Sequence, residues 1–418
     1  MKIQINHLAK MEGHASFVGS LYSGNIAKAK IITEEGARLI EGILVGRKYW
    51  EAPIITARIC GICPVVHSLT AIEALENAFK IKVDSQSRLL RRMLEAAQII
   101  HSHTLHIYFL SIPDFYEEND SLKFAQKYPK EAKAALRIRE FATKIVEVVG
   151  GRTVHPIASE IGGFKTPPNR DQLKTLMNNF NSIIRDAEIL CQFTQEIKYP
   201  KLNRQTNFVS LKNQNQYGYY LGRINISNNK LLKVEDFYQQ MSEQNSPETL
   251  VKRVTLNDQS YMVGALARLN NDSDFLHRRA AKWLKKSKLK IPVYNSFYNV
   301  LAQSLEVIHF LEEIFELSNN YLSNNSEPNI FSKKKLMSGA GLAGVEAPRG
   351  TLIHYYEVKD NVIKNCNIIT PTAQFLNNLE DDIKTYLPLT KKVSSIKRKN
   401  QIKTLIRAYD PCISCATH

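Results

Sequence analysis

The chain has 418 residues, of which 44% are hydrophobic, and 56 Lys and Arg against 40 Asp and Glu give a formal net charge of +16. This length allows a large buried core. Because the chain has few cysteines for its length, we do not expect a framework of disulfides. Apolar runs stay shorter than the about 18 residues of a membrane-spanning helix. Residues 1–10 also lack the features of a secretory signal. We therefore expect a cytoplasmic protein without a transmembrane segment.

The excess positive charge lies in separate clusters at residues 278–290, 333–335 and 391–399. Scattered basic clusters are typical of solvated faces or of surfaces that dock a partner protein. A basic nucleic-acid-binding protein is the alternative that this charge leaves open.

From Ile3 to Thr33, short apolar stretches alternate with Gly and Asn turns, which predicts a small antiparallel β region. Further along, apolar residues recur every three or four positions, the period of buried helices, in residues 68–79, 87–110, 131–149, 171–196, 295–322 and 374–386. Residues 201–229 are polar and rich in Asn, which predicts a loop-rich insertion. Residues 351–358 and 362–369 flank a Lys-Asp-Asn turn and predict a β-hairpin.

These elements predict an α+β fold that is predominantly α, with a central bundle of long helices. Small antiparallel β regions are expected near the N-terminus and before the C-terminus. We divide the chain into residues 1–67, a β region with the first cysteine motif; 68–164, a helical core; 165–292, a variable helical and loop insertion; and 293–418, a helical and hairpin region with the second cysteine motif. The last region is expected to form one compact unit with residues 1–164.

Four of the six cysteines form two Cys-x-x-Cys pairs, Cys60/Cys63 and Cys412/Cys415, near opposite ends of the chain. This spacing lets two sulfurs bind one metal from a single turn. A structural zinc module usually has its pairs about 15–20 residues apart, and a thioredoxin-like redox motif needs one pair within a βαβ unit. The separation of these pairs fits neither, so we predict a core metal site assembled from both ends.

The residues beside the pairs are also polar. Arg58 precedes and His67 follows the first pair, Asp410 precedes the second, and the sequence stops at His418. Because chain ends normally fray beyond their last useful residue, we expect this end to be built into the site.

The motifs RICGICPVVH at 58–67 and DPCISCATH at 410–418 closely resemble those of the catalytic large subunits of nickel–iron hydrogenases. The resemblance extends in order to residues 11–14, 40–47, 106–114, 151–152, 155–156, 346–350 and 370–372. Only residues 165–292 contain no motif that matches the family's pattern. The resemblance implies an enzyme that reversibly cleaves H2 heterolytically into protons and electrons.

The resemblance implies that Cys60 and Cys412 are terminal nickel ligands. Cys63 and Cys415 would bridge the nickel to an iron that carries carbon monoxide and cyanide, giving a Ni-Fe(CO)(CN)2 centre. Soft thiolates suit both metals. Because four anionic sulfurs repel one another, the metals' charge keeps them deprotonated, and we expect protonated thiols in the apo protein.

In the family's pattern, the thiolate of Cys412 takes the proton from H2 and Glu12 relays it outward. A carboxyl in a dry pocket is suited to such a transfer. We therefore expect Glu12 to lie beside the metal centre rather than on a solvated surface.

Arg349 is implied to lie over the open side of the metals, where its guanidinium would bind a cyanide nitrogen or polarise hydrogen. Thr372 would donate to the other cyanide, and Pro348 belongs to the same cofactor-binding set. Asp114 and Asp410 resemble the carboxylates that hold the arginine, since an unpaired buried cation is costly.

Arg58 and His67 resemble groups that surround and tune the metal thiolates. Glu41, His418 and the main-chain carbonyl of Ile368 resemble the ligands of a separate magnesium or iron(II) site. Mostly oxygen ligands suit magnesium. Such a site would hold the C-terminus against the segment of the first cysteine pair.

An iron–sulfur cluster needs about four cysteines. After the metal centre only Cys191 and Cys366 remain, and lone cysteines are usually small buried hydrophobic residues. An iron–sulfur small subunit is therefore required to carry the electrons.

Residues 369–375 and 414–418 most resemble the cytoplasmic, cofactor-coupled branch that includes the alpha chain of NADP-linked sulfhydrogenases. This implies further diaphorase-type subunits with flavin and NAD(P), although Phe375 departs from the branch's usual asparagine. Two alternatives remain open: a relative of the quinone-site subunit of respiratory complex I, which lacks the four cysteines, and a zinc-binding, nucleic-acid-binding protein.

Overall fold

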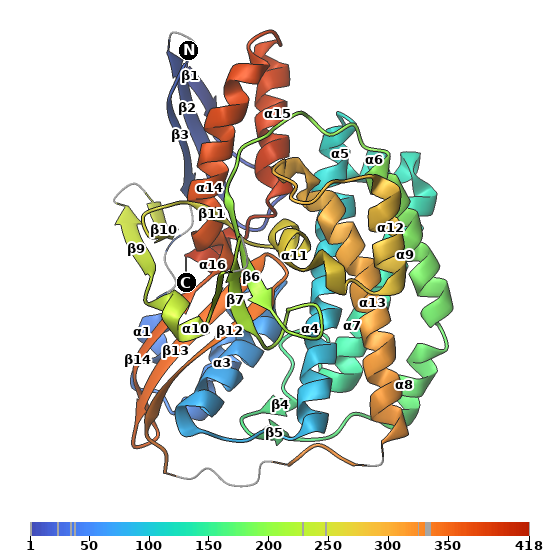
Figure 1. The fold of residues 1–418 in the computed structure, drawn as a ribbon, viewed down its shortest axis with the longest axis vertical. Coiled ribbons are helices and arrows are strands. Elements are labelled where there is room, and N and C mark those ends of the chain that lie inside the picture. Colours follow the sequence, from blue (N-terminus) through green and yellow to red (C-terminus); the bar gives the residue numbers. More distant parts are fainter. Residues whose placement is uncertain are drawn as a thin grey trace.

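Long helices pack together on one side of the chain, and small β-sheets lie on the other (Figure 1). The computed structural model describes residues 2–22, 25–33, 36, 39–227, 230–246, 249–324, 326–330 and 336–417. The bundle contains α4 (Ser85–Leu105), α7 (Pro129–Gly150), α8 (Arg170–Met177), α9 (Phe180–Gln195), α12 (Arg278–Ser287) and α13 (Asn299–Ser323). Helix α4 packs on α7 and α13, and α9 packs on the same two helices. The predicted α+β fold with a long-helix bundle is confirmed.

The N-terminal sheet has the antiparallel order β1 (Lys2–Ile5), β2 (Ala15–Tyr22) and β3 (Asn25–Thr33). Its apolar side chains alternate along the strands, so that Ile3, Ile5, Phe17 and Ile31 are buried on one face. The β region predicted for Ile3 to Thr33 is confirmed. The chain between β1 and β2 contains Glu12.

A second antiparallel sheet has the order β12 (Gly339–Ala347), β13 (Gly350–Lys359) and β14 (Val362–Ile369). The predicted hairpin corresponds to β13 and β14, and β12 adds a strand to it. Helix α3 (Pro64–Phe79) packs against β12 and β13. This packing is close: a Cβ atom added at Gly341 would lie 2.3 Å from the backbone oxygen of Ala74.

We expect Gly341→Ala to lower the free energy of unfolding by about 1–3 kcal/mol, because the new methyl group overpacks the α3 backbone. Denaturant unfolding of the purified chain measures this loss. Gly42→Ala is the control, since a Cβ there meets nothing within 4 Å. An equal, small effect of the two changes would contradict the close packing of α3 on β12.

The middle of the chain forms a mixed sheet in the order β11 (Tyr261–Met262), β6 (Asn207–Lys212), β7 (Arg223–Ile226) and β8 (Lys230–Leu232). Strands β6 and β7 lie where we predicted a loop-rich insertion, so that prediction is wrong for them. Their few apolar residues, including Val209, Leu211 and Ile224, are buried, and β6 packs on α11 (Ala265–Asp272). Tertiary packing outweighs the polar composition here. A separate hairpin pairs β9 (Met241–Ser246) with β10 (Thr249–Leu256), and α10 (Val234–Tyr238) precedes it.

The C-terminal region returns to helix in α14 (Pro371–Tyr386), α15 (Ser395–Ala408) and the short α16 (Ile413–Ala416), and α16 packs on α14 and β10 (Figure 1). The other short helices are α1 (Ile40–Leu44), α2 (Ala52–Thr56), α5 (Ile112–Phe115), α6 (Ser121–Lys127), the 3-10 turns Tyr49–Glu51, Ser273–Phe275, Ser296–Tyr298 and Leu387–Thr390, and a π-helical turn at His106–Ser111. Strands β4 (Ser159–Glu160) and β5 (Gly163–Phe164) form a two-stranded ladder.

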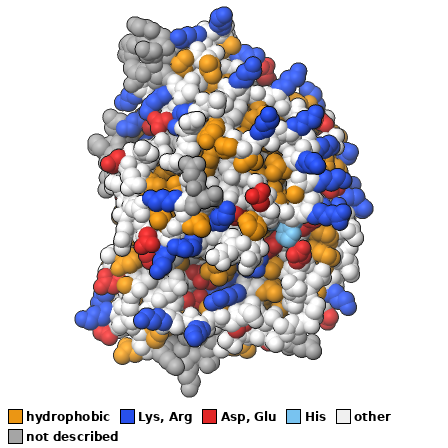
Figure 2. All heavy atoms as spheres, viewed as in Figure 1, with side chains coloured by type: hydrophobic (Ala, Val, Ile, Leu, Met, Phe, Trp, Pro, Cys, Tyr) orange, Lys and Arg blue, Asp and Glu red, His pale blue; other side chains and the backbone are white. Residues whose placement is uncertain are grey.

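Lys and Arg side chains are dispersed over the face seen in Figure 2, with acidic and hydrophobic side chains between them. Among the residues that the structure describes, no helix is both long enough and apolar enough to cross a membrane.

Candidate metal centre

The sulfurs of Cys60, Cys63, Cys412 and Cys415 converge in one cluster, with all four atoms within 4.8 Å of one another. The Sγ atoms of Cys60 and Cys412 are 3.7 Å apart, and those of Cys63 and Cys415 are 3.3 Å apart. The Sγ atoms of Cys412 and Cys415 are 2.8 Å apart. None of the four cysteines forms a disulfide, and all are buried. The two ends of the chain therefore meet at one site, as the cysteine spacing predicted.

Each cysteine pair lies at the start of a helix. Cys63 is the N-cap of α3, and Pro64 occupies the first turn, where its missing N–H costs nothing. Cys412 is the N-cap of α16, and its main-chain N–H donates to Thr372 Oγ1 at the start of α14 (3.1 Å). Helix starts place the sulfurs near backbone N–H groups, an environment that favours negative charge.

The segment around Glu12 holds the second pair in place. Glu12 forms a parallel β-bridge with Cys412, and the N–H of Ile413 donates to the Glu12 carbonyl (3.0 Å). The Glu12 carboxylate accepts from the Cys412 thiol (3.0 Å) and from the N–H of Ser414 (3.0 Å). The acid predicted as the proton relay thus contacts the predicted sulfur directly.

Burial raises the pKa of the Cys412 and Cys415 thiols well above the usual range. Without a bound cation, burial therefore favours the protonated form of these two sulfurs. Hydrogen bonds with Cys412 and the other two cysteines instead lower the pKa of Cys60, so the expectation of four protonated thiols in the apo chain does not hold for Cys60. A donor set of four buried, unoxidised sulfurs fits soft transition metals, whose charge compensates for the cost of ionising the thiols.

Arg349 lies beside the sulfurs and is anchored from the second cysteine segment. Its Nε donates to the Asp410 carbonyl (2.7 Å), and its Nη2 bonds Asp410 Oδ1 (2.9 Å). Burial disfavours the charged guanidinium, but the Asp410 carboxylate and the nearby cysteine sulfurs together outweigh burial and raise the pKa of Arg349. The group therefore remains a cation. Ser102 Oγ lies 3.5 Å from Nη1, and Gln303 Nε2 donates to Asp410 Oδ2 (3.1 Å).

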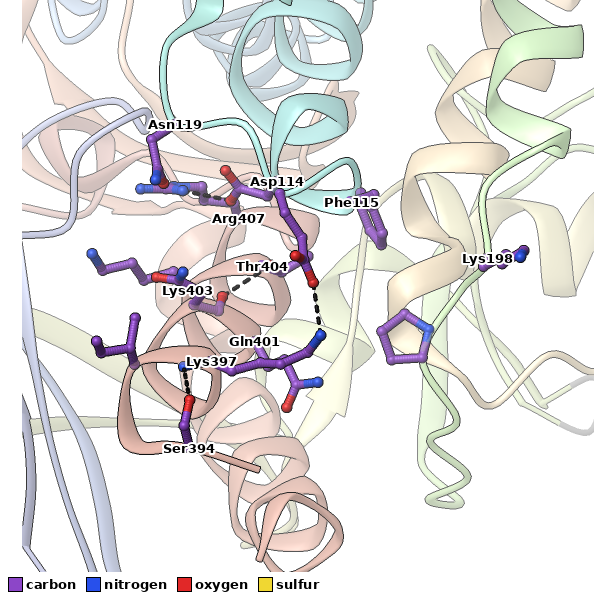
Figure 3. A pocket seen from close by; sticks show the side chains of 14 residues that line it. Asp114, Phe115, Asn119, Lys198, Ser394, Lys397, Gln401, Lys403, Thr404 and Arg407 are labelled. Atoms are coloured by element: carbon purple, nitrogen blue, oxygen red, sulfur yellow. Dashed lines mark hydrogen bonds and ion pairs between the residues drawn. The ribbon is translucent and has the colours of Figure 1, made fainter. Parts of the chain in front are cut away.

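Asp114 is placed differently from what we expected. Its carboxylate pairs with Lys10 Nζ (2.7 Å) and with Arg407 Nη1 (2.5 Å). Within the described part of the chain, Asp114 forms no hydrogen bond or ion pair with Arg349. Figure 3 shows Asp114 and Arg407 facing each other in a surface pocket of about 550 Å³. The expectation that Asp114 holds Arg349 is therefore wrong. Two nearer cations, which the local sequence did not reveal, neutralise it instead.

Arg58 is also placed differently, because its side chain is exposed and donates to the carbonyl of Ile54 (2.6 Å). Among the described residues, Arg58 is therefore not one of the groups that surround the four sulfurs. His67 is buried on α3, where its Nδ1 lies 3.4 Å from Nε2 of His354. Pro348 is buried and precedes Arg349 in the two-residue turn between β12 and β13.

Glu41 and Ile368 are brought together, since the N–H of Ile368 donates to Glu41 Oε1 (2.8 Å). Lys252 Nζ lies 2.8 Å and 3.0 Å from the two carboxylate oxygens of Glu41. The ammonium group of Lys252 thus already neutralises the Glu41 carboxylate. His418, the third residue of the predicted site, lies outside the described residues.

The sequence reasoning missed Ser102, Gln303 and Lys252. Ser102 and Gln303 come from the long helices α4 and α13, and Lys252 comes from β10, so neither spacing nor a motif connects them to the cysteines. No feature of the sequence points to Lys252, and Ser102 and Gln303 are only two of several polar side chains on the buried faces of their helices. Cys191 and Cys366 are buried, as predicted, and burial raises the pKa of each thiol to about 12.

A family model described as nickel-dependent hydrogenase matches residues 38–134 and 232–418, more than half of the chain. The chain therefore belongs to the nickel-dependent hydrogenase family. It is the catalytic chain of a hydrogenase, an oxidoreductase that binds nickel.

The full chain is similar to the alpha chain of sulfhydrogenase 1 of Pyrococcus furiosus, with 29% identity over 425 residues that cover 98% of that protein. The alpha chain of sulfhydrogenase 2 from the same organism is 28% identical over 431 residues, and 99% of it is covered. A solved structure of an NAD+-reducing NiFe-hydrogenase in the H2-reduced state superposes over 100% of this chain and 99% of that chain, with 26% identity and a TM-score of 0.90. The resemblance to nickel–iron hydrogenase large subunits is thereby confirmed, and the two alternatives lose their support.

Proposed function

We propose that Cys60, Cys63, Cys412 and Cys415 hold a Ni-Fe(CO)(CN)2 centre, with Cys60 and Cys412 as terminal nickel ligands and the other two as bridges. The convergence of four buried sulfurs from both chain ends is the observation that carries this proposal. When bound, the metal pair would supply the site at which H2 is split heterolytically, which yields two protons and two electrons in total. Soft thiolate donors suit both metals.

In this proposal Cys412 Sγ takes the proton and Glu12 accepts it. The two groups are already in hydrogen-bond contact at 3.0 Å, within the reach that proton transfer needs. The N–H of Ser414 holds the same carboxylate oxygen and so keeps it aimed at the sulfur. Proton transfer therefore needs no movement of the backbone.

Arg349 presents a fixed cation beside the sulfurs, and Asp410 holds it there without help from Asp114. A guanidinium with two anchored nitrogen atoms can direct its remaining donors toward a cyanide nitrogen or toward hydrogen. Thr372 Oγ1 accepts from the N–H of Cys412, which places its hydroxyl to serve the second cyanide. Pro348, beside Arg349 in the turn between β12 and β13, and the buried His67 on α3 stay predicted members of the proposed site.

A second metal fits less well. A magnesium or iron(II) ion bound by Glu41 would have to displace Lys252, whose ammonium group contacts both carboxylate oxygens. We therefore propose no catalytic step that uses it, and the predicted role of His418 stays a prediction.

We also propose that electrons leave through an iron–sulfur small subunit. The described cysteines outside the centre, Cys191 and Cys366, are too few for a cluster of about four cysteine ligands. We propose in addition flavin and NAD(P) subunits, coupling to NADP and a cytoplasmic location. The structural neighbour named as an NAD+-reducing NiFe-hydrogenase supports electron exchange with a nicotinamide cofactor.

Elemental analysis together with infrared spectroscopy of the purified complex tests the centre. We expect one nickel per catalytic chain, iron in excess of nickel because the clusters of the small subunit also contain iron, and stretching bands from metal-bound carbon monoxide and cyanide. Zinc alone, or nickel without those bands, would rule the proposed centre out.

A further inference from the structure

Arg268, on α11, contacts the turn that carries Arg349. Pro348 and Arg349 are the two residues between the paired ends of β12 and β13, where Ala347 pairs with Gly350. Arg268 Nη1 donates to the carbonyl of Ala347 (3.0 Å), and Nη2 donates to the carbonyl of Pro348 (3.1 Å). Buried carbonyl groups need hydrogen-bond partners, and Arg268 is the partner of these two.

Arg268 is itself held rigidly. Its side chain is fully buried, and Nε and Nη2 bond the two carboxylate oxygens of Glu306, each at 2.6 Å. Nη1 bonds Glu346 Oε2 at 2.8 Å. Tyr217 and His103 bond the same Glu306 carboxylate and fix its orientation in turn. A two-bond pair between arginine and carboxylate sets geometry as well as charge.

The start of α11 contacts the same turn from its backbone. A Cβ atom added at Gly264 would lie 2.9 Å from the carbonyl oxygen of Arg349, and the positive φ of +105° there also favours glycine. The Arg268 N–H donates to the Gly264 carbonyl (2.9 Å), so the two contacts come from one helical turn. Helix α11 thus holds the turn at two points.

We propose that Arg268 is a positioning residue that fixes Arg349 over the metal centre. This inference rests on the proposed function, in which the Arg349 guanidinium acts beside the metals. Asp410 holds the end of that side chain, and Arg268 holds the backbone from which it extends. Loss of the two carbonyl bonds lets the turn shift, and a displacement of about 1 Å in a reacting group can cost about 100-fold in rate.

The test is Arg268→Lys in the complete enzyme complex. Lysine keeps the charge but cannot bond the three carboxylate oxygens and two carbonyls that Arg268 bonds. We expect nickel and iron to be retained, the cyanide and carbon monoxide infrared bands to shift, and kcat to fall about 10- to 100-fold with little change in KM for H2.

Arg91→Lys is the matched control. Arg91 is also fully buried, bonds the carboxylates of Glu73 and Glu76, and donates to the carbonyls of Glu160 and Gly163. Arg91→Lys should lower stability and leave the infrared bands in place. Equal band shifts in both variants would overturn the proposal, because they would trace to general loosening of the core.

Unchanged bands and turnover in Arg268→Lys would also overturn it. Should that variant lose its metals, Glu306→Gln decides: we expect a smaller shift of the same bands, and no shift overturns the inference. Absence of the bands from the wild-type enzyme would instead contradict the proposed metal centre. The two failures are therefore distinguishable.

Discussion

Cys412→Ser is expected to abolish hydrogen oxidation and to leave the protein deficient in nickel. The Sγ atom of Cys412 contacts the sulfurs of Cys60 and Cys415 and the carboxylate of Glu12. Cys412 therefore belongs both to the cysteine cluster and to the proposed proton path. A serine hydroxyl is a hard donor that stays protonated, and it replaces a soft thiolate poorly as a nickel ligand.

Metal content by elemental analysis and H2-dependent dye reduction measure this effect. Cys191→Ala is the control, since Cys191 is a lone buried thiol on α9 outside the cluster. It should retain metal and activity at a modest cost in stability. A Cys412→Ser enzyme with full nickel content and ordinary turnover would remove Cys412 from the centre.

Glu12→Gln is expected to retain both metals and to lower hydrogen/deuterium exchange about 100- to 10,000-fold, the usual contribution of a positioned general base. Glutamine keeps the shape of the side chain and can still accept from the N–H of Ser414. It cannot take a proton from Cys412 Sγ, which is the step that the 3.0 Å contact allows.

Isotope exchange between H2 and D2O follows this step without requiring an electron acceptor. Glu140→Gln is the control, because Glu140 is an exposed carboxylate paired with Lys144 on α7. The control should exchange at the wild-type rate. Full exchange by Glu12→Gln would show that the proton leaves by another group.

The long helices were predictable because each has a strong period of buried apolar residues. Helices α4, α7 and α13 fall close to the predicted segments, and β13 and β14 match the predicted hairpin. Strands β6 and β7 were not predictable, since short strands in a polar segment gain their stability from packing on α11 rather than from local propensity. The proposed boundaries at residues 67, 164 and 292 stay predictions.

The sequence by itself determined which ligand atoms are available to a metal, because two Cys-x-x-Cys pairs supply four thiolates in any fold that brings them together. Only the tertiary structure decided which charges face one another. It paired Arg349 with Asp410 and Asp114 with Arg407, set Lys252 on Glu41, and placed Arg268 behind the turn that carries Arg349. The physical reason is that ligand type is a property of single residues and short spacings, whereas ion pairing depends on distances between segments far apart in the chain.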